Sequence, residues 1–156
     1  MARRLFAPLL AIGLVLSAAA AALPAVAALG EPVASVASDT KALAATRRAD
    51  TARQGYTVHE LATGGSVVRE FSSPAGVVFG IAWQGIAEPD LTPLLGSYLT
   101  EYRASLAETP PARGRRSQQV IGAHVVVERW GHMRNIRGRA YVPALLPSGV
   151  TAHDIQ

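Results

Sequence analysis

The sequence contains no cysteine among its 156 residues. A disulfide framework is therefore excluded, and so is a bacterial lipoprotein, which attaches its lipid to a cysteine. Common catalytic motifs are also missing, because no H-E-x-x-H, G-x-S-x-G, P-loop or G-x-G-x-x-G pattern occurs. The sequence names no catalytic nucleophile, so its function has to be sought in the placement of single residues.

The first 27 residues have the pattern of a cleavable export signal. Arg3 and Arg4 give a basic start, residues 5–16 are apolar, and Ala-Val-Ala at 25–27 matches a cleavage site. We expect export by the general secretory route to the periplasm or the medium, with membrane contact only through this signal. An uncleaved anchor is the alternative, because residues 5–29 are long enough to span a bilayer.

The charge balance is nearly neutral outside this signal. The sequence has fifteen Lys and Arg and eleven Asp and Glu, and two of the arginines lie in the signal. Thirteen basic residues then face eleven acidic ones, which leaves a net charge of +2. Such a small charge favours no nucleic-acid partner.

The remaining chain, residues 28–156, is about the right length for one small domain. An alanine-rich segment, 33–48, predicts a helix that begins at Ser38 or Asp39. A second helix is predicted from an N-cap at Asp90. Its apolar face has helical spacing and consists of Leu91, Leu95, Tyr98, Tyr102 and Leu106.

Five segments have the residue pattern of strands, namely 56–62, 66–72, 77–83, 120–130 and 135–142. The first three predict an antiparallel meander, and the last two a C-terminal hairpin. Because no strand–helix–strand alternation appears, we predict an α+β fold with a mostly antiparallel sheet packed by one or two helices. Prolines and arginines at 109–117 predict a flexible basic linker.

The third strand has one face of large side chains and one of small ones. Strand alternation predicts that the large ones share a face: Val77, Phe79, Ile81 and Trp83. The small residues, Val78, Gly80 and Ala82, would then leave room for close approach by the helix from Asp90.

Two charged doublets lie in the first two strands. If Gly64-Gly65 is a two-residue hairpin loop, His59 faces Glu70 and Glu60 faces Arg69, on opposite faces of the sheet. Cross-strand ion pairs that fix the register are one interpretation. The other is that His59 and Glu70 are an acid–base couple, which needs a cleft and a third group to orient the imidazole.

The histidines give few further hints. Their spacing matches no metal-binding motif, so we expect neither a metal nor a cofactor. His132 remains a weak catalytic candidate beside His59 and Glu70.

An arginine-rich segment runs from Arg129 to Pro143. Arg137, Arg139 and Tyr141 would share one face of a strand and, with Arg134, could bind a carboxylate, a phosphate or an anionic glycan. A solvated face with paired arginines is the alternative interpretation.

Five blocks of the sequence together resemble one family of short exported proteobacterial proteins, catalogued as domain of unknown function 2844. The blocks are "ALGE" at 28–31, "YTVHEL" at 56–61, "VVREFSSPAGVVFGIAWQG" at 67–85, "PDLTPLLGSYLTEY" at 89–102 and "GHMRNIRGRAYVPALLPSGV" at 131–150. The resemblance implies a signal-bearing envelope or secreted protein, and it brings no activity, cofactor or catalytic residue.

Two functions follow as hypotheses. The first is a non-enzymatic binding or accessory domain of the bacterial envelope, whose partner is an envelope protein or an anionic ligand. The alternative is a small periplasmic hydrolase-like enzyme that uses a His/Glu pair.

Overall fold

The computed structural model describes residues 29–110 and 116–156. The predicted export signal and the central part of the predicted linker lie outside these residues, so both stay predictions.

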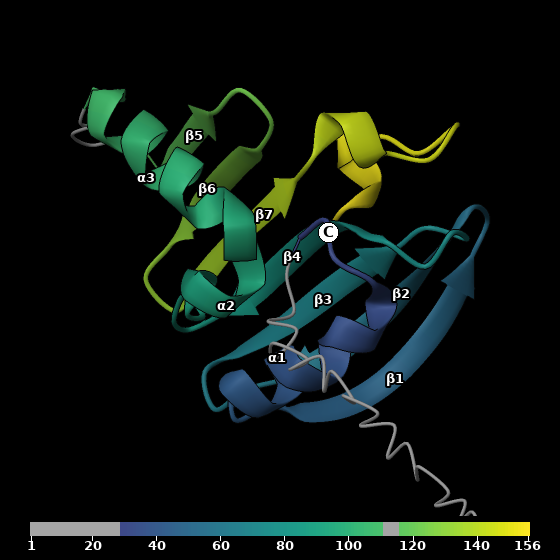
Figure 1. The fold of residues 1–156 in the computed structure, drawn as a ribbon. Coiled ribbons are helices and arrows are strands. Elements are labelled where there is room, and N and C mark those ends of the chain that lie inside the picture. Colours follow the sequence, from purple (N-terminus) through teal and green to yellow (C-terminus); the bar gives the residue numbers. More distant parts are fainter. Residues whose placement is uncertain (1–28, 111–115) are drawn as a thin grey trace, which may run out of the picture.

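The described residues form a single antiparallel sheet of seven strands (Figure 1). The strands are β1 (Thr46–Arg53), β2 (Tyr56–Ala62), β3 (Ser66–Ser72), β4 (Val78–Gly85), β5 (Ser117–Ile121), β6 (Val126–His132) and β7 (Asn135–Tyr141). Their order across the sheet is β1-β2-β3-β4-β7-β6-β5. The C-terminal hairpin thus continues the meander along β4, and the predicted α+β fold is confirmed.

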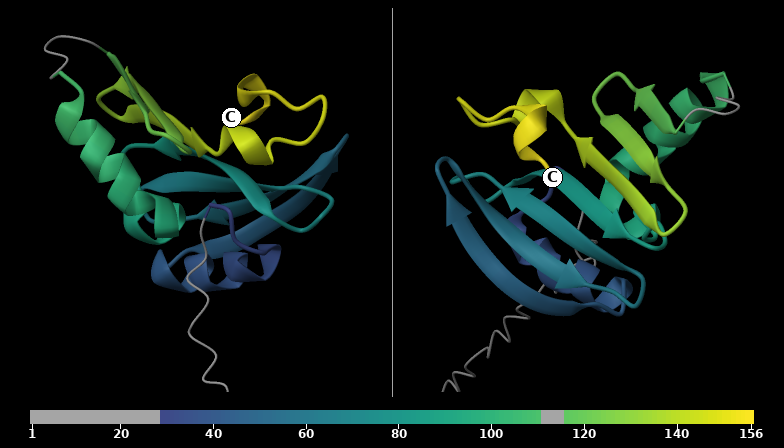
Figure 2. Two further views of the ribbon diagram at one scale, coloured as in Figure 1. Left: turned by 45° about the horizontal axis from the view of Figure 1, so that its top comes forward. Right: turned by 180° about the vertical axis from the view of Figure 1, so that it is seen from behind.

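Helices cover one face of the sheet, and the chain after β7 covers part of the other (Figure 2). The helical elements are α1 (Val36–Ala42), α2 (Leu91–Leu95) and α3 (Leu99–Glu108), with single 3₁₀ turns η1 (Val33–Ser35) and η2 (Gly96–Tyr98). The tail contains η3 (Pro143–Leu145) and η4 (Ala152–Asp154). We call these two sides the helix face and the open face.

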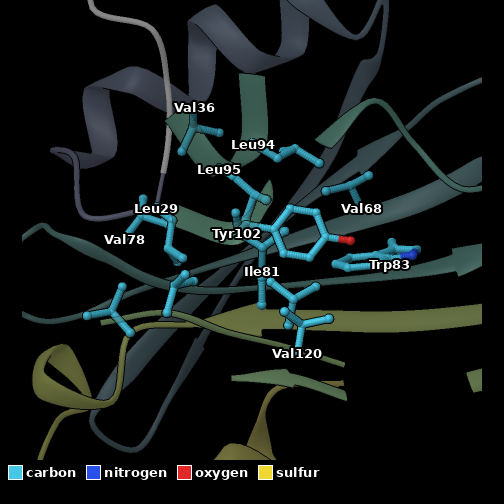
Figure 3. Close-up of a cluster of buried hydrophobic side chains, with 14 of the residues drawn as sticks. Leu29, Val36, Val68, Val78, Ile81, Trp83, Leu94, Leu95, Tyr102 and Val120 are labelled. Atoms are coloured by element: carbon cyan, nitrogen blue, oxygen red, sulfur yellow. The ribbon is translucent and has the colours of Figure 1, made fainter. Parts of the chain in front are cut away.

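Each face has its own hydrophobic core. On the helix face, Trp83 and Tyr102 belong to a cluster with Leu94 and Leu95 of α2 (Figure 3). On the open face, Phe71 and Phe79 pack with Ile155 of the tail. Burial of these apolar side chains supplies the main driving force for folding.

Several predicted elements are confirmed. β2 and β3 have the predicted bounds, and β4 and β7 differ from them by one or two residues. The second helix begins after Asp90, whose Oδ1 accepts a hydrogen bond from Thr92 N at 2.8 Å. Gly96, at φ +46°, then divides the helix into α2 and α3.

The prediction for residues 33–48 is wrong at both ends. The helix α1 begins at Val36, ends at Ala42 and buries Asp39 rather than using it as a cap. The chain then forms β1, in which all eight residues are exposed. An edge strand held by backbone pairing to β2 shows no apolar alternation, so its sequence gives no strand pattern.

The predicted strand 120–130 is in fact two strands. A turn closed by Gly122 N donating to Val125 O, at 2.8 Å, separates β5 from β6. β5 starts at Ser117, inside the segment predicted as linker.

The predicted faces of the third strand are also corrected. A β-bulge pairs Phe71 with Gly80 and Ser72 with Val78, so Phe79 points to the open face while Ile81 and Trp83 stay on the helix face. The small face is covered by the tail, not by a helix. A Cβ at Gly80 would lie 2.7 Å from Ile155 Cδ1.

We predict that Gly138→Ala destabilises the fold by about 1–3 kcal/mol, the usual cost of overpacking. A Cβ at Gly138 would lie 2.2 Å from the Trp83 ring and 2.8 Å from Glu128 O. Gly64→Ala is the matched control, because no atom lies within 4 Å of its Cβ position. Urea unfolding should separate the two variants, and equal stability would contradict this account of the packing.

Candidate functional site

The register of the β2–β3 hairpin places the two charged doublets as predicted. His59 pairs with Glu70, and Glu60 with Arg69. On the open face, Arg69 Nε donates to Glu60 Oε2 at 3.0 Å, which is a half-exposed ion pair. On the helix face, His59 and Glu70 are both buried.

His59 is hydrogen-bonded at both ring nitrogens. Its Nδ1 lies 3.0 Å from Asp50 Oδ1, and its Nε2 lies 2.8 Å from Ser72 Oγ. His59 and Ser72 are 5% and 4% exposed, whereas the side chain of Asp50 is 45% exposed. The group that orients the imidazole is therefore Asp50, and the described part of the chain shows no hydrogen bond from His59 to Glu70.

Arg47 completes this chain of groups. Its Nη2 donates to Asp50 Oδ2 at 2.5 Å and its Nε to Asp50 Oδ1 at 3.1 Å. This hydrogen-bonded guanidinium lowers the pKa of Asp50, so the carboxylate beside His59 is charged. A serine, a histidine and a carboxylate in this order have the connectivity in which the imidazole can accept the serine proton.

Asp50 and Ser72 were not among the predicted site residues. Asp50 lies in β1, which the sequence pattern did not reveal, and Ser72 is two residues beyond Glu70 on the same face of β3. Only the pairing of β1 with β2, which sets Asp50 opposite His59, brings the three side chains together.

Glu70 has a different partner, Asp39 of α1. Both residues are 1% exposed, and none of their four carboxylate oxygens accepts a hydrogen bond from an N–H or hydroxyl group of the described residues. Burial is the main cause that raises the pKa of Asp39 to about 7 and that of Glu70 to about 9. The charge of Asp39 and a hydrogen bond between the two carboxyl groups add to the effect on Glu70. The two carboxyl groups therefore share at least one proton at neutral pH.

Described residues of the open face line hollows beside the tail. One, of about 510 Å³, lies over β1–β3 and includes the Glu60–Arg69 pair. Another, of about 480 Å³, we call the Trp130 groove; it is lined by Ser117, Gln118, Gln119, Glu128, Arg129, Trp130, Arg139, His153 and Gln156. A shallower hollow of about 380 Å³ adjoins this groove and shares Trp130 with it.

The predicted arginine-rich surface is only partly assembled. Arg139 lies in the Trp130 groove, where it donates to Glu128 and to the backbone oxygen of Ala152, with its Cζ 5.5 Å from the centre of the Trp130 ring. Arg137 is exposed opposite Trp130 in the β6–β7 register.

The other two predicted ligand residues lie apart from the groove. Arg134 is in the turn between β6 and β7 at φ +66°. Tyr141 is half-buried against the core of the open face.

The remaining histidines are separate from His59. His132 is exposed at the end of β6, which β4 and β7 separate from β3, and it lines the shallower hollow. His124 Nδ1 lies 3.0 Å from Glu101 Oε2 at the surface. Within residues 29–110 and 116–156, no three acidic or histidine side chains are placed to hold a metal ion. No helix in these same ranges is long and apolar enough to cross a membrane.

Comparison with known proteins gives one family and no activity. A family model described as "Protein of unknown function (DUF2844)" matches residues 25–155. None of the curated proteins matches the sequence. Among solved structures, a cysteine-rich secretory protein from Staphylococcus aureus aligns with 8% identity and a TM-score of 0.45. The alignment covers 74% of this chain and 45% of that one, so this chain spans less than half of its length.

We predict that the free energy of unfolding falls as the pH rises from about 4 to about 9. A carboxyl group with a raised pKa binds more protons in the folded chain than in the unfolded one, so its stabilising contribution is lost between the two pKa values. The window runs from the ordinary values near 4 to the raised values of Asp39 and Glu70. Asp50, whose pKa is lowered, makes the free energy of unfolding depend on pH only below this window.

Glu70→Gln should flatten this slope and stabilise the protein at pH 9 by about 1–3 kcal/mol, the usual cost of a buried polar group without a partner. The exposed Glu108 provides the control variant, Glu108→Gln, which should keep the wild-type slope. Urea titrations at several pH values measure both, and identical slopes for the two variants would show that the pair does not set the pH dependence.

Proposed function

The chain belongs to the DUF2844 family, whose description gives no activity, and we propose that it is a binding domain of the bacterial cell envelope whose Trp130 groove holds an anionic, hydroxyl-rich ligand. The observation that carries this proposal is the convergence of a half-exposed tryptophan, two arginines and three glutamines in one open hollow. The export-signal pattern of residues 1–27 supports an envelope location.

Contacts within the protein hold the side chains of the groove in place without a ligand. Glu128 and the oxygen of Ala152 hold Arg139 in place, and Arg139 in turn lies against the Trp130 ring. Gln119 Nε2 donates to Glu128 Oε1 at 2.6 Å, which orients this carboxylate as well. Side chains that are already ordered lose little entropy on binding, which favours affinity.

The chemistry of the groove selects a ligand class. An aromatic ring offers a flat apolar surface, amide side chains both donate and accept hydrogen bonds, and guanidinium groups suit carboxylates. Arg139 and Arg129 are each paired with a glutamate, so the exposed Arg137 beside Trp130 supplies the net positive charge. An acidic oligosaccharide offers matching groups to all three kinds of side chain.

We expect a uronic-acid tetrasaccharide to quench the fluorescence of Trp130, since Trp83 is only 2% exposed and reports little from the surface. Trp130→Ala should weaken binding at least tenfold, about 1.4 kcal/mol. Arg137→Gln should weaken binding of this probe but not of a neutral tetrasaccharide. The exposed Arg103 of α3 provides the control, Arg103→Gln, which should bind as the wild type does.

Calorimetric titration of the same variants checks the fluorescence result. If neither tetrasaccharide binds at millimolar concentration, or if Trp130→Ala binds like the wild type, the groove is not the ligand site.

A second candidate function is hydrolysis of an ester or amide by Ser72, His59 and Asp50. The observation that favours it is the unbroken chain of hydrogen bonds from Ser72 Oγ through the imidazole to Asp50. In such a reaction Ser72 Oγ attacks the carbonyl carbon, its proton passes to His59 Nε2 and then to the leaving alcohol or amine, and water releases the acyl group. These three residues replace the His59–Glu70 pair of the sequence-based hypothesis, because Asp50 and not Glu70 is hydrogen-bonded to His59.

We predict for this candidate that a fluorophosphonate labels Ser72 and that Ser72→Ala lowers p-nitrophenyl acetate hydrolysis about a thousandfold. Ser38, exposed on α1, gives the control variant Ser38→Ala, which should react as the wild type does. Peptide mass spectrometry locates the label. Intact protein that carries no label on Ser72 between pH 6 and pH 9 would remove hydrolysis from consideration.

A further inference from the structure

The Asp39–Glu70 pair joins α1 to the sheet. Asp39 is on the inner side of α1 with Ser35 and Val36, and Glu70 is on the helix face of β3. Figures 1 and 2 show α1 lying along this face over β1, β2 and β3. The strand register and the His59–Ser72 hydrogen bond place both of these side chains on the same face. The contact between α1 and the sheet therefore includes two acids that are cut off from water.

Among the described residues, no cation forms an ion pair with either acid. The charge of Arg47 lowers the pKa of Glu70 but does not outweigh the effect of burial. The charged and titratable groups around it are Arg47 and Asp50 of β1 and His59 of β2, and Arg47 is already bonded to Asp50. On the other side, Glu70 pairs with the apolar Ile81 of β4, and α2 contributes leucines. Lys41 of α1 is exposed. Two carboxylates in such a place are stable only while they hold a proton between them.

Apart from this pair, α1 itself has few contacts with the sheet, whereas the segment before it is fixed by Val33 N donating to Gly76 O at 2.7 Å and by a bridge between Pro32 and Val77. The helix has only seven residues, of which Val36 is the one fully buried apolar side chain, and Leu43 after its end is half-buried. A helix of this length has little stability of its own and depends on its packing. The protonation of Asp39 and Glu70 is therefore a large part of what keeps α1 in contact with the sheet.

We propose that Asp39 and Glu70 form a proton-operated latch that holds α1 over His59 and Ser72. With a shared proton, the two carboxyl groups bond to each other and the helix is closed. When the pair loses its protons, both charges need water, and the shortest way to reach it is for α1 to lift away from β3. The lifted helix uncovers the His59–Ser72 side of the sheet.

This latch is independent of the Trp130 groove, which lies on the open face, and of whether Ser72 acts as a nucleophile. It concerns access to the helix face alone. Its failure would leave ligand binding by the groove untouched, so the two proposals are tested separately.

The absence of cysteine allows a direct test with single-cysteine reporters. Val36→Cys places a thiol on the covered side of α1, and Ser38→Cys places one on its exposed side. The ratio of their labelling rates with a maleimide removes the effect of pH on the thiol itself. We expect this ratio to rise at least tenfold between pH 6 and pH 9, and to stay constant when Glu70→Gln is added.

A third reporter, Val127→Cys, monitors global unfolding, since Val127 is buried on β6 away from α1. It should remain protected at every pH. The latch is overturned if the Val36→Cys ratio does not change with pH, or if Val127→Cys becomes reactive in parallel. If Val36→Cys does not fold, Ser35→Cys takes its place, because Ser35 is 2% exposed and differs from cysteine by one atom.

Discussion

The register of the β2–β3 hairpin is the constraint on which both faces of this protein depend. Because side chains alternate along a strand, pairing His59 with Glu70 sends both to the helix face, and pairing Glu60 with Arg69 sends those two to the open face. A slip of one residue would exchange the two sets and would place Leu61 and Val68, now fully buried, in water. The same apolar pattern that builds the core therefore buries an acid and an imidazole beneath α1.

This burial has a cost that the fold has to offset elsewhere. Replacing buried charged groups by apolar ones often stabilises a protein, so a buried pair of acids is not explained by stability. His59 is satisfied at both nitrogens and is compatible with a purely structural role, whereas none of the oxygens of Asp39 and Glu70 has a donor from the described residues other than the shared proton. The raised pKa values of this acid pair make its protonation, and with it the contact between the two carboxyl groups, depend on pH.

The sequence predicts this architecture well where local signals are strong. The Gly-Gly turn and the alternating residues of β2 and β3 predict both strands and their register, and the N-cap at Asp90 predicts the start of α2. Prediction from the sequence fails where tertiary contacts decide the structure. β1 has no apolar alternation, because it is an exposed edge strand held by backbone hydrogen bonds. The bulge that places Phe79 on the open face cannot be recognised from the residue pattern.

The candidate site is likewise predictable from the sequence only in part. The cross-strand position of Glu70 relative to His59 follows from the register alone. The bonds of His59 to Asp50 and Ser72 do not, since one partner is in the unrecognised strand and the other lies diagonally on β3. The contact between Asp39 and Glu70 joins a helix to a strand 31 positions later, and no local pattern reports such a pair.

The two faces can change separately because of the strands between them. β4 is buried along nearly its whole length, from Val78 to Trp83, and together with β7 it separates β3 from β6. A closely packed strand with cores on both sides transmits little displacement unless both cores yield, since packed interiors resist gradual deformation. Movement of α1 at β1–β3 can therefore leave the Trp130 groove intact. Under the two proposals, this arrangement keeps the Trp130 groove constant while the helix face responds to pH.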